Sequence, residues 1–455
     1  MAYRDLREFL QALEQEGEVL KVKQELNPRF EMSAAMKLIN DGKVVQFENI
    51  TGYPGKKAVG NILGTRRKIA RFMGVPEETL TQSFTDRKGQ MIAPQVVESG
   101  PVKEVIIKDN IDLGSLLPAL TYHEKDISPY LTSAIAIARD PETGVQNIGL
   151  HRIQVKGGNR LGILLANPPV ATFWQRAESA GKGLEVVLAI GADPAIMLGT
   201  MTKATLEGPD KIAVAGGIKG EAIELTPAES SDILVPAHAE LILEGRIIPN
   251  YTEQDGPFGE TTGSYFEFQS PVIEVHTVTH RCDFIYQFMQ VWGVEPDVIL
   301  SLGVSADNLS NLKKLVPTLR GINFAPGTCM FNAVASVHGA TPTEVRQFMT
   351  MILSMDQRIK QIVVVDDDVD IFDMREVQWA LATRFQADRD LLLLTGLKGY
   401  VIDHSIHADG STSKIGLDAT KKGENPEQFE KITVPRESMA RAMDALKNAK
   451  DTGVP

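Results

Sequence analysis

The sequence predicts a multidomain α/β protein with a mainly β central part, and three observations support this prediction. The chain has 455 residues, more than one hydrophobic core usually organises, so two or three domains are expected. From about residue 105 to residue 286, short β-branched runs alternate with glycine and proline, which is typical of a barrel or a sandwich. In the last third, strands alternate with helices, which indicates an α/β layer. The predicted domains are an N-terminal α/β domain (1–105), a central domain (106–310) and a C-terminal α/β domain (311–455) with a final helix.

The N-terminal part begins with an amphipathic helix. Leu6, Phe9, Leu10 and Leu13 recur at helical spacing, and Gly17 is placed to end the helix. A strand over Lys43–Phe47 and a helix over Arg67–Met73 follow.

The central part consists of short apolar runs that predict strands, with one helix expected over Phe173–Lys182. The predicted strands are Ala134–Ala138, Gly162–Leu165, Val186–Ile190, Ile212–Ala215 and Val272–Val278.

The last third contains a clear helix start. Thr341-Pro342-Thr343-Glu344 is a capping box with proline at the first helical position, and it predicts a helix to Met355. The run Ile362–Val365 predicts a buried strand, and Glu376–Ala382 begins another helix. The acidic run Asp366–Asp370 is interpreted as the solvated end of that strand and a helix N-cap, not as a metal site.

Composition excludes several classes of protein. The chain is 43% hydrophobic and 23% charged with a net charge of −12, which disfavours a nucleic-acid partner. Its two cysteines, Cys282 and Cys329, have no metal-type spacing and fit a reducing compartment. The charged N-terminal helix is not expected to be a signal peptide, and no apolar run approaches the roughly 20 residues that span a bilayer. A cytoplasmic protein is expected.

The familiar nucleotide and metalloprotease motifs are absent. The chain has no P-loop, no GxGxxG after a strand, no GxSxG and no HExxH. The usual sequence evidence for an ATP-binding protein or a Rossmann-type NAD-binding protein is therefore missing. His276 and His280 lie four residues apart in a β-rich run, where they are interpreted as structural or surface residues.

Two segments carry the strongest chemical signal. Asp255-Gly256-Pro257-Phe258-Gly259-Glu260 predicts a rigid, non-helical turn that holds two carboxylates near each other, which suits general acid–base chemistry. A polar surface turn is the alternative. The second segment is Asn147-Ile148-Gly149-Leu150-His151-Arg152.

Together these segments resemble the signature of the UbiD family of prenylated-FMN-dependent decarboxylases. The resemblance covers nearly the whole chain and includes further motifs of the family in the right order. These are Pro236-Ala237-His238-Ala239-Glu240, Leu243-Glu244-Gly245, Val365-Asp366-Asp367-Asp368 and Lys414-Ile415-Gly416-Leu417-Asp418-Ala419-Thr420.

The resemblance implies an architecture and a reaction. It implies a central flavin-binding split β-barrel between an N-terminal α/β piece and a C-terminal α/β oligomerisation domain, assembled as a homo-oligomer (dimer or hexamer). The reaction is reversible, non-oxidative decarboxylation of an aromatic, heteroaromatic or α,β-unsaturated carboxylic acid. The cofactor would be prenylated FMN, supplied by a flavin prenyltransferase. No membrane or nucleic-acid partner is expected.

Catalytic roles follow from the same resemblance. Arg152 would bind the substrate carboxylate, Glu260 would donate the proton, and Asp255 would hold Arg152. The family often has glutamate where this chain has Asp255, so the side chain that carries the carboxylate is about one methylene shorter here. A structural salt bridge is the alternative role for Arg152.

The family's metal site is altered in this chain. Well-studied members hold a divalent metal (Mn), with K, through an asparagine, a histidine and a glutamate. Asn147 matches the first ligand, but counting along the chain places Pro169 and Lys211 at the other two positions, and neither side chain ligates a divalent ion in that way. Either Lys211 replaces the metal against the flavin phosphate, or the count is shifted and Lys211 lies at the surface.

Other contacts are expected by position. Ile148, Leu150, Met201 and Lys203 should lie along the flavin, and Lys360 stands where the family often has a phosphate-binding lysine, although a helix-end lysine is the alternative. Candidates for the pocket are Thr261, Phe284, Met289, Asn323, Cys329 and a predicted loop over Ser411–Leu417.

Two rival functions stay open at this point. One is an ordinary FMN oxidoreductase, which would bind unmodified FMN and would not need an arginine between two acids. The other is a non-catalytic UbiD-like subunit of a multi-component carboxylase, which the altered metal site favours and the retained Arg152, Asp255 and Glu260 disfavour.

Overall fold

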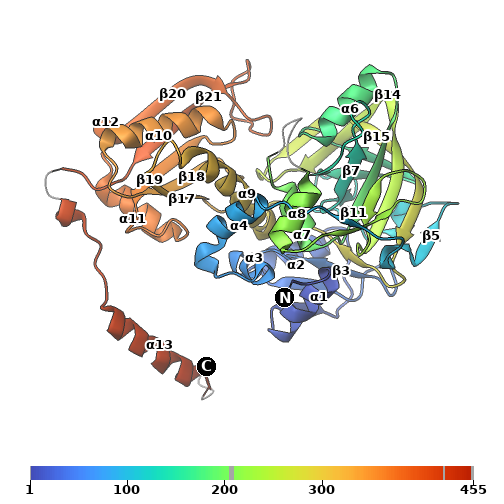
Figure 1. Cartoon of the computed structure of the whole chain (residues 1–455), viewed down its shortest axis with the longest axis horizontal. Helices are drawn as coiled ribbons and strands as arrows, with labels where there is room; N and C mark the ends of the chain where they lie inside the picture. Colours follow the sequence, from blue (N-terminus) through green and yellow to red (C-terminus); the bar gives the residue numbers. More distant parts are fainter. Residues whose placement is uncertain (1, 204–209, 424–425, 452–455) are drawn as a thin grey trace.

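The computed structural model of the chain describes residues 2–203, 210–423 and 426–451. Its three parts lie side by side in Figure 1: an N-terminal sheet with its helices in blue, a curled central sheet in green and yellow, and a C-terminal α/β layer in orange. The mixed α/β multidomain fold with a half-barrel sheet confirms the predicted fold class.

The N-terminal sheet is closed by a strand from much later in the chain. Its order is β1-β2-β3-β16, and β16 pairs in parallel with β3. The strands are β1 (Val19–Val22), β2 (Val44–Phe47), β3 (Lys57–Gly60) and β16 (Ile285–Gln287), and the helices are α1 (Leu6–Gln15), α2 (Glu31–Leu38), α3 (Arg66–Met73) and α4 (Leu80–Lys88). As its periodicity predicts, α1 buries Leu6, Phe9, Leu10 and Leu13.

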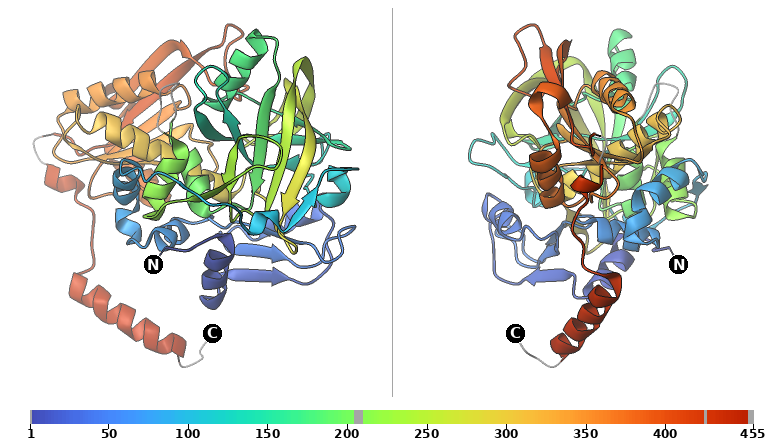
Figure 2. Two further views of the ribbon diagram at one scale, coloured as in Figure 1. Left: turned by 45° about the vertical axis from the view of Figure 1, so that its right-hand side comes forward. Right: turned by 90° about the vertical axis from the view of Figure 1, so that its left-hand side faces the viewer.

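The central sheet has nine described strands in the order β6-β9-β10-β15-β14-β11-β7-β8, with β5 added on β15. It curls strongly on itself, as both views of Figure 2 show. Its strands are β5 (Val105–Ile107), β6 (Tyr130–Leu131), β7 (Ile135–Arg139), β8 (Gln146–Leu150), β9 (Ile153–Gly157), β10 (Arg160–Ile163), β11 (Leu184–Ile190), β14 (Leu241–Gly259) and β15 (Tyr265–His280). A small sheet of β4 (Gln95–Val96), β12 (Glu224–Pro227) and β13 (Leu234–Pro236) lies beside it.

Four helices accompany the central sheet in the described part of the chain: α5 (Leu113–Leu116), α6 (Val170–Ser179), α7 (Pro194–Thr200) and α8 (Lys211–Lys219). The strand predicted over Ile212–Ala215 is wrong, because these residues form the first turns of α8. Every residue of α8 from Lys211 to Ile218 is buried, so the helix shows no amphipathic period and its short apolar run resembles a strand.

The C-terminal layer is a five-stranded sheet in the order β17-β18-β19-β21-β20. The strands are β17 (Leu319–Phe324), β18 (Asn332–Val337), β19 (Gln361–Asp366), β20 (Leu391–Lys398) and β21 (Ser411–Asp418), and the helices are α9 (Val294–Leu312), α10 (Pro342–Met355), α11 (Met374–Arg384), α12 (Ala387–Asp390) and α13 (Arg436–Asp451). The capping box of Thr341 and Glu344 is present. The loop predicted over Ser411–Leu417 is wrong, because these residues form β21.

No helix within the described ranges combines the length and the apolar character that crossing a bilayer requires.

A buried carboxylate joins α9 to the N-terminal domain. Glu295, in the first turn of α9, accepts the backbone N–H of Asn61 at 3.0 Å and that of Leu63 at 2.7 Å. The side chain is 1% exposed. This contact fixes the start of the helix whose next turn lines the central cavity described below.

We expect Glu295→Ala to weaken the contact between α9 and the N-terminal domain, because it leaves two buried N–H groups without acceptors at a cost of about 1–3 kcal/mol each. Hydrogen exchange of the Asn61 and Leu63 amides should accelerate by about tenfold or more. Asp297→Ala is the matched control, since Asp297 bonds to Gly327 instead. Equal acceleration in both variants would contradict the assignment.

Candidate active site

The Asp255–Glu260 segment is a bulge within a hairpin strand, not the predicted turn. Asp255 pairs with Phe268 of β15 and Phe258 with Phe266, so Gly256 and Pro257 are extra residues on β14. Gly256 has φ +110°, and a Cβ there would lie 2.5 Å from the carbonyl oxygen of Phe266, so only glycine fits. The chain turns at Glu260, whose N–H donates to Ser264 O at 2.8 Å.

Arg152 lies between the two carboxylates, as the resemblance predicts. Its Nη2 is 3.0 Å from Asp255 Oδ1, and its Nη1 pairs with Glu260 Oε1. The guanidinium also lies 5.1 Å from the ring centre of Phe258 and 5.0 Å from that of Phe268. The Arg152 side chain is 7% exposed, so two anions and two aromatic faces replace most of its hydration.

Asp255 is held by more groups than the sequence predicted. It is fully buried and accepts the hydroxyls of Tyr130 at 3.0 Å (Oδ1) and Ser270 at 2.8 Å (Oδ2). Burial and the adjacent Asp255 carboxylate raise the pKa of Tyr130, which keeps its hydroxyl a donor. The shorter side chain of aspartate therefore still reaches Arg152. No sequence signal identified Tyr130, Ser270 or Phe268, because they meet Asp255 only through sheet pairing.

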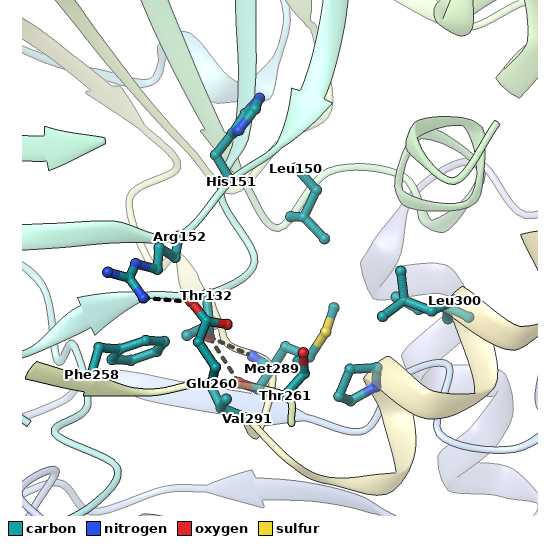
Figure 3. A pocket seen from close by; sticks show the side chains of 12 residues that line it. Thr132, Leu150, His151, Arg152, Phe258, Glu260, Thr261, Met289, Val291 and Leu300 are labelled. Carbon is teal, nitrogen blue, oxygen red and sulfur yellow. Dashed lines mark hydrogen bonds and ion pairs between the residues drawn. The ribbon is translucent and has the colours of Figure 1, made fainter. Parts of the chain in front are cut away.

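Arg152 and Glu260 border a cavity of about 600 Å³ that is otherwise mainly apolar (Figure 3). Of the predicted pocket residues, Thr261 and Met289 line it, whereas Phe284 is buried in the hydrophobic core. The lining residues are Thr132, Leu150, His151, Arg152, Phe258, Glu260, Thr261, Met289, Val291, Pro296, Ile299 and Leu300.

A larger cleft of about 1690 Å³ continues from this cavity and runs between the central and C-terminal domains. The two spaces share Leu150, His151, Thr261 and Leu300. Further along, the cleft wall carries the cationic side chains of Lys203, Lys211, Arg358 and Lys398 and the carboxylates of Asp307 and Asp356. The space is therefore mainly apolar at one end and has an excess of cationic side chains at the other.

Four of the predicted flavin contacts line the larger cleft: Leu150, Met201, Lys203 and Lys211. Of the predicted pocket residues, Cys329 also lines this cleft, while Asn323 lines a neighbouring cavity.

Three predicted residues lie elsewhere. Asn147 and Ile148 are buried in β8, behind the cleft wall. Lys360 pairs with Asp403 at 2.7 Å and is not among the lining residues of the cleft.

His151 presents a hydrogen-bond acceptor. Its Nδ1 lies 3.1 Å from Leu164 O, and since a carbonyl oxygen only accepts, Nδ1 carries the proton. Burial lowers the pKa of His151 to about 4, so the ring is neutral near pH 7. Its Nε2 is buried without a partner among the described residues, which leaves a lone pair for a ligand N–H or O–H.

The two residues that the count along the chain assigns to the family's metal position do not fit a divalent cation. Pro169 precedes α6 and offers no side-chain ligand, and Lys211 is cationic. Within the part of the chain that the structure describes, no cluster of three His, Cys, Asp or Glu could hold a metal.

Comparisons with known proteins find matches to all three parts of the chain. Family models of 3-octaprenyl-4-hydroxybenzoate carboxy-lyase, UbiD, match residues 10–88 (N-terminal domain), 95–294 (Rift-related domain) and 297–419 (C-terminal domain). Anhydromevalonate phosphate decarboxylase of Methanosarcina mazei is 32% identical over 446 residues, which are 96% of this chain and 100% of the relative. Phenolic acid decarboxylase of Bacillus subtilis is 32% identical over 441 residues, 92% of this chain and 93% of the relative.

Among solved structures, the UbiD-class enzyme HmfF from Pelotomaculum thermopropionicum, in complex with FMN, superposes with a TM-score of 0.91 at 37% identity. The match covers 95% of this chain and 97% of that one.

Proposed function

Because the chain belongs to the UbiD family of carboxy-lyases, we propose that it decarboxylates an aromatic, heteroaromatic or α,β-unsaturated acid reversibly and without oxidation, using prenylated FMN. The observation that carries the proposal is the buried Arg152 guanidinium between Asp255 and Glu260 at the end of an apolar cavity. An ordinary flavin oxidoreductase has no need of this arrangement.

The larger cleft suits the cofactor. Its apolar end and its cationic end match the ring system and the phosphate of a flavin, and FMN in the related HmfF structure supports this choice of ligand. Leu150, Met201, Lys203 and Lys211 would hold it. Prenylated FMN, made by a flavin prenyltransferase, supplies when bound an electron sink for the pair that remains on an sp² carbon when CO2 leaves.

Arg152 would bind the substrate carboxylate. Its Nε–H is buried without an acceptor among the described residues, so the guanidinium keeps a donor for a ligand in addition to those that Asp255 and Glu260 occupy. Asp255 is a positioning residue, since Tyr130 and Ser270 fix its carboxylate and it in turn orients Arg152.

Glu260 would deliver the proton to the carbon that loses CO2. It lines the cavity and is held by Arg152 in the substrate-free protein. A substrate carboxylate would compete with Glu260 for the same guanidinium. Glu260 would act as the acid in decarboxylation and as the base in the reverse reaction.

We expect Glu260→Gln to lower kcat by roughly 10²–10⁴-fold, the usual contribution of a general acid. Flavin content should stay unchanged, because Glu260 acts on the substrate. The assay is CO2 release by protein produced together with a flavin prenyltransferase. Glu267→Gln, at an exposed position on β15, is the control and should retain activity. Undiminished turnover by Glu260→Gln would remove Glu260 from this role.

The cavity favours a substrate with one carboxylate and an apolar remainder. Among the described residues Arg152 is its sole cationic lining side chain, since His151 is neutral. A second carboxylate would be buried without a partner. We expect kcat/KM for an aromatic or unsaturated monoacid to exceed that for the matching diacid by about tenfold or more, about 1.4 kcal/mol in transition-state binding. A preference for the diacid would contradict this reading.

The C-terminal helix supports a homo-oligomer. Helix α13 projects from the body of the chain in Figure 1, and Met439, Met443 and Leu446 are 50%, 54% and 66% exposed at helical spacing. Such a face normally packs against another surface. We expect replacement of all three residues by lysine to reduce the molar mass measured by light scattering. The control Ser438→Lys should not change it, and a monomeric wild-type protein would contradict the proposal.

A further inference from the structure

Lys211 is buried where the cationic end of the cleft meets two helices. It is the first residue of α8, and its side chain is 4% exposed. Close packing of α7 on α8 fixes this position, because a Cβ at Gly199 would lie 2.7 Å from Lys211 O. The lysine therefore belongs to a rigid wall of the cleft and does not lie at the surface.

The Lys211 ammonium has unused hydrogen-bonding capacity. Its Nζ donates to Thr200 O at 3.0 Å, which occupies one of three N–H donors. No carboxylate among the described residues forms an ion pair with it; that of Asp307 acts from further away and is already paired with Lys88. A buried ammonium that has no paired carboxylate favours binding of an anion.

The groups around Lys211 disfavour a divalent cation. Asn147 Oδ1, the atom that would ligate a metal, accepts the backbone N–H groups of Ile148 at 2.9 Å and of Lys211 at 3.3 Å. The positive ends of these two dipoles point at the oxygen. The next N–H of α8, from Ile212, donates to Asp210 at 2.8 Å, so the ammonium and not the helix end offers the available donors.

Resting on the proposed function, we propose that Lys211 binds the flavin phosphate directly, so that the cofactor binds without a divalent metal. A phosphate monoester would accept the remaining N–H donors of the ammonium and supply the counter-charge that the buried lysine lacks. Of the other cations on the wall, Arg358 is already paired with Asp356 at 2.6 Å, and Lys203 is exposed. Lys211 is thus the most buried cation available to the phosphate.

The test compares FMN with riboflavin, which lacks the phosphate. The Kd of each flavin is measured by fluorescence quenching on the wild-type protein, in EDTA and in Mn²⁺ or Mg²⁺. We expect FMN affinity to be equal in all three conditions. Weaker FMN binding in EDTA that Mn²⁺ restores would overturn the proposal, and this arm needs no variant.

The same measurement is made on Lys211→Met, which removes the ammonium group and keeps an unbranched side chain that is one atom shorter. The preference for FMN over riboflavin should fall by about tenfold or more, as expected for a lost charged hydrogen bond, with the Kd of riboflavin unchanged. Lys398→Met, at an exposed lining position of the same cleft, is the matched control and should change the preference much less. An unchanged preference in Lys211→Met would refute the direct contact alone, whereas failure of the wild type to bind either flavin would overturn the proposed function as well.

Discussion

A guanidinium that is almost fully enclosed by protein requires counter-charges at hydrogen-bond distance, because the loss of hydration otherwise costs several kcal/mol. Arg152 obtains them from Asp255 and Glu260. Strand β14 of the central sheet and the turn that follows it hold these two carboxylates in place. The bulge at Gly256 and Pro257 restores the pairing of β14 with β15 after Asp255. Glu260 can then lie where the strand ends, on the same cavity as Arg152.

The two ends of the cleft differ in polarity, and this difference would orient a bound ligand. Arg152 and Glu260 pair at the mainly apolar cavity, whereas four cationic side chains and the carboxylates of Asp307 and Asp356 line the larger cleft. The excess of cations there would attract the phosphate of a molecule whose aromatic ring system lies toward the apolar cavity. The neutral His151 lies between the two ends, where it can accept a hydrogen bond without disturbing the charge pattern.

Local sequence rules predicted the elements that obey them. The apolar spacing of α1 and the capping box of α10 identify real helices, and Arg152, Asp255 and Glu260 were identified from motifs. The sequence predicts a strand over Ile212–Ala215, within α8, because the helix is buried from Lys211 to Ile218 and so lacks a periodic pattern.

The residues that donate hydroxyl hydrogen bonds to Asp255 could not be predicted from the sequence. Tyr130 and Ser270 reach Asp255 through the register of a curled sheet. Register depends on contacts distant in sequence, and one chain read alone does not reveal it. The burial of Lys211 was likewise set by the packing of α7 on α8 and was left open by the sequence.

The central claim is that this fold and this arginine–carboxylate arrangement serve decarboxylation with a prenylated flavin. The most direct measurement is the mass and absorbance of the flavin released from protein produced with and without a flavin prenyltransferase. The account predicts prenylated FMN in the first case and its absence in the second. Unmodified FMN in both preparations would contradict the account and favour an oxidoreductase, and protein without flavin in both would indicate a non-catalytic subunit.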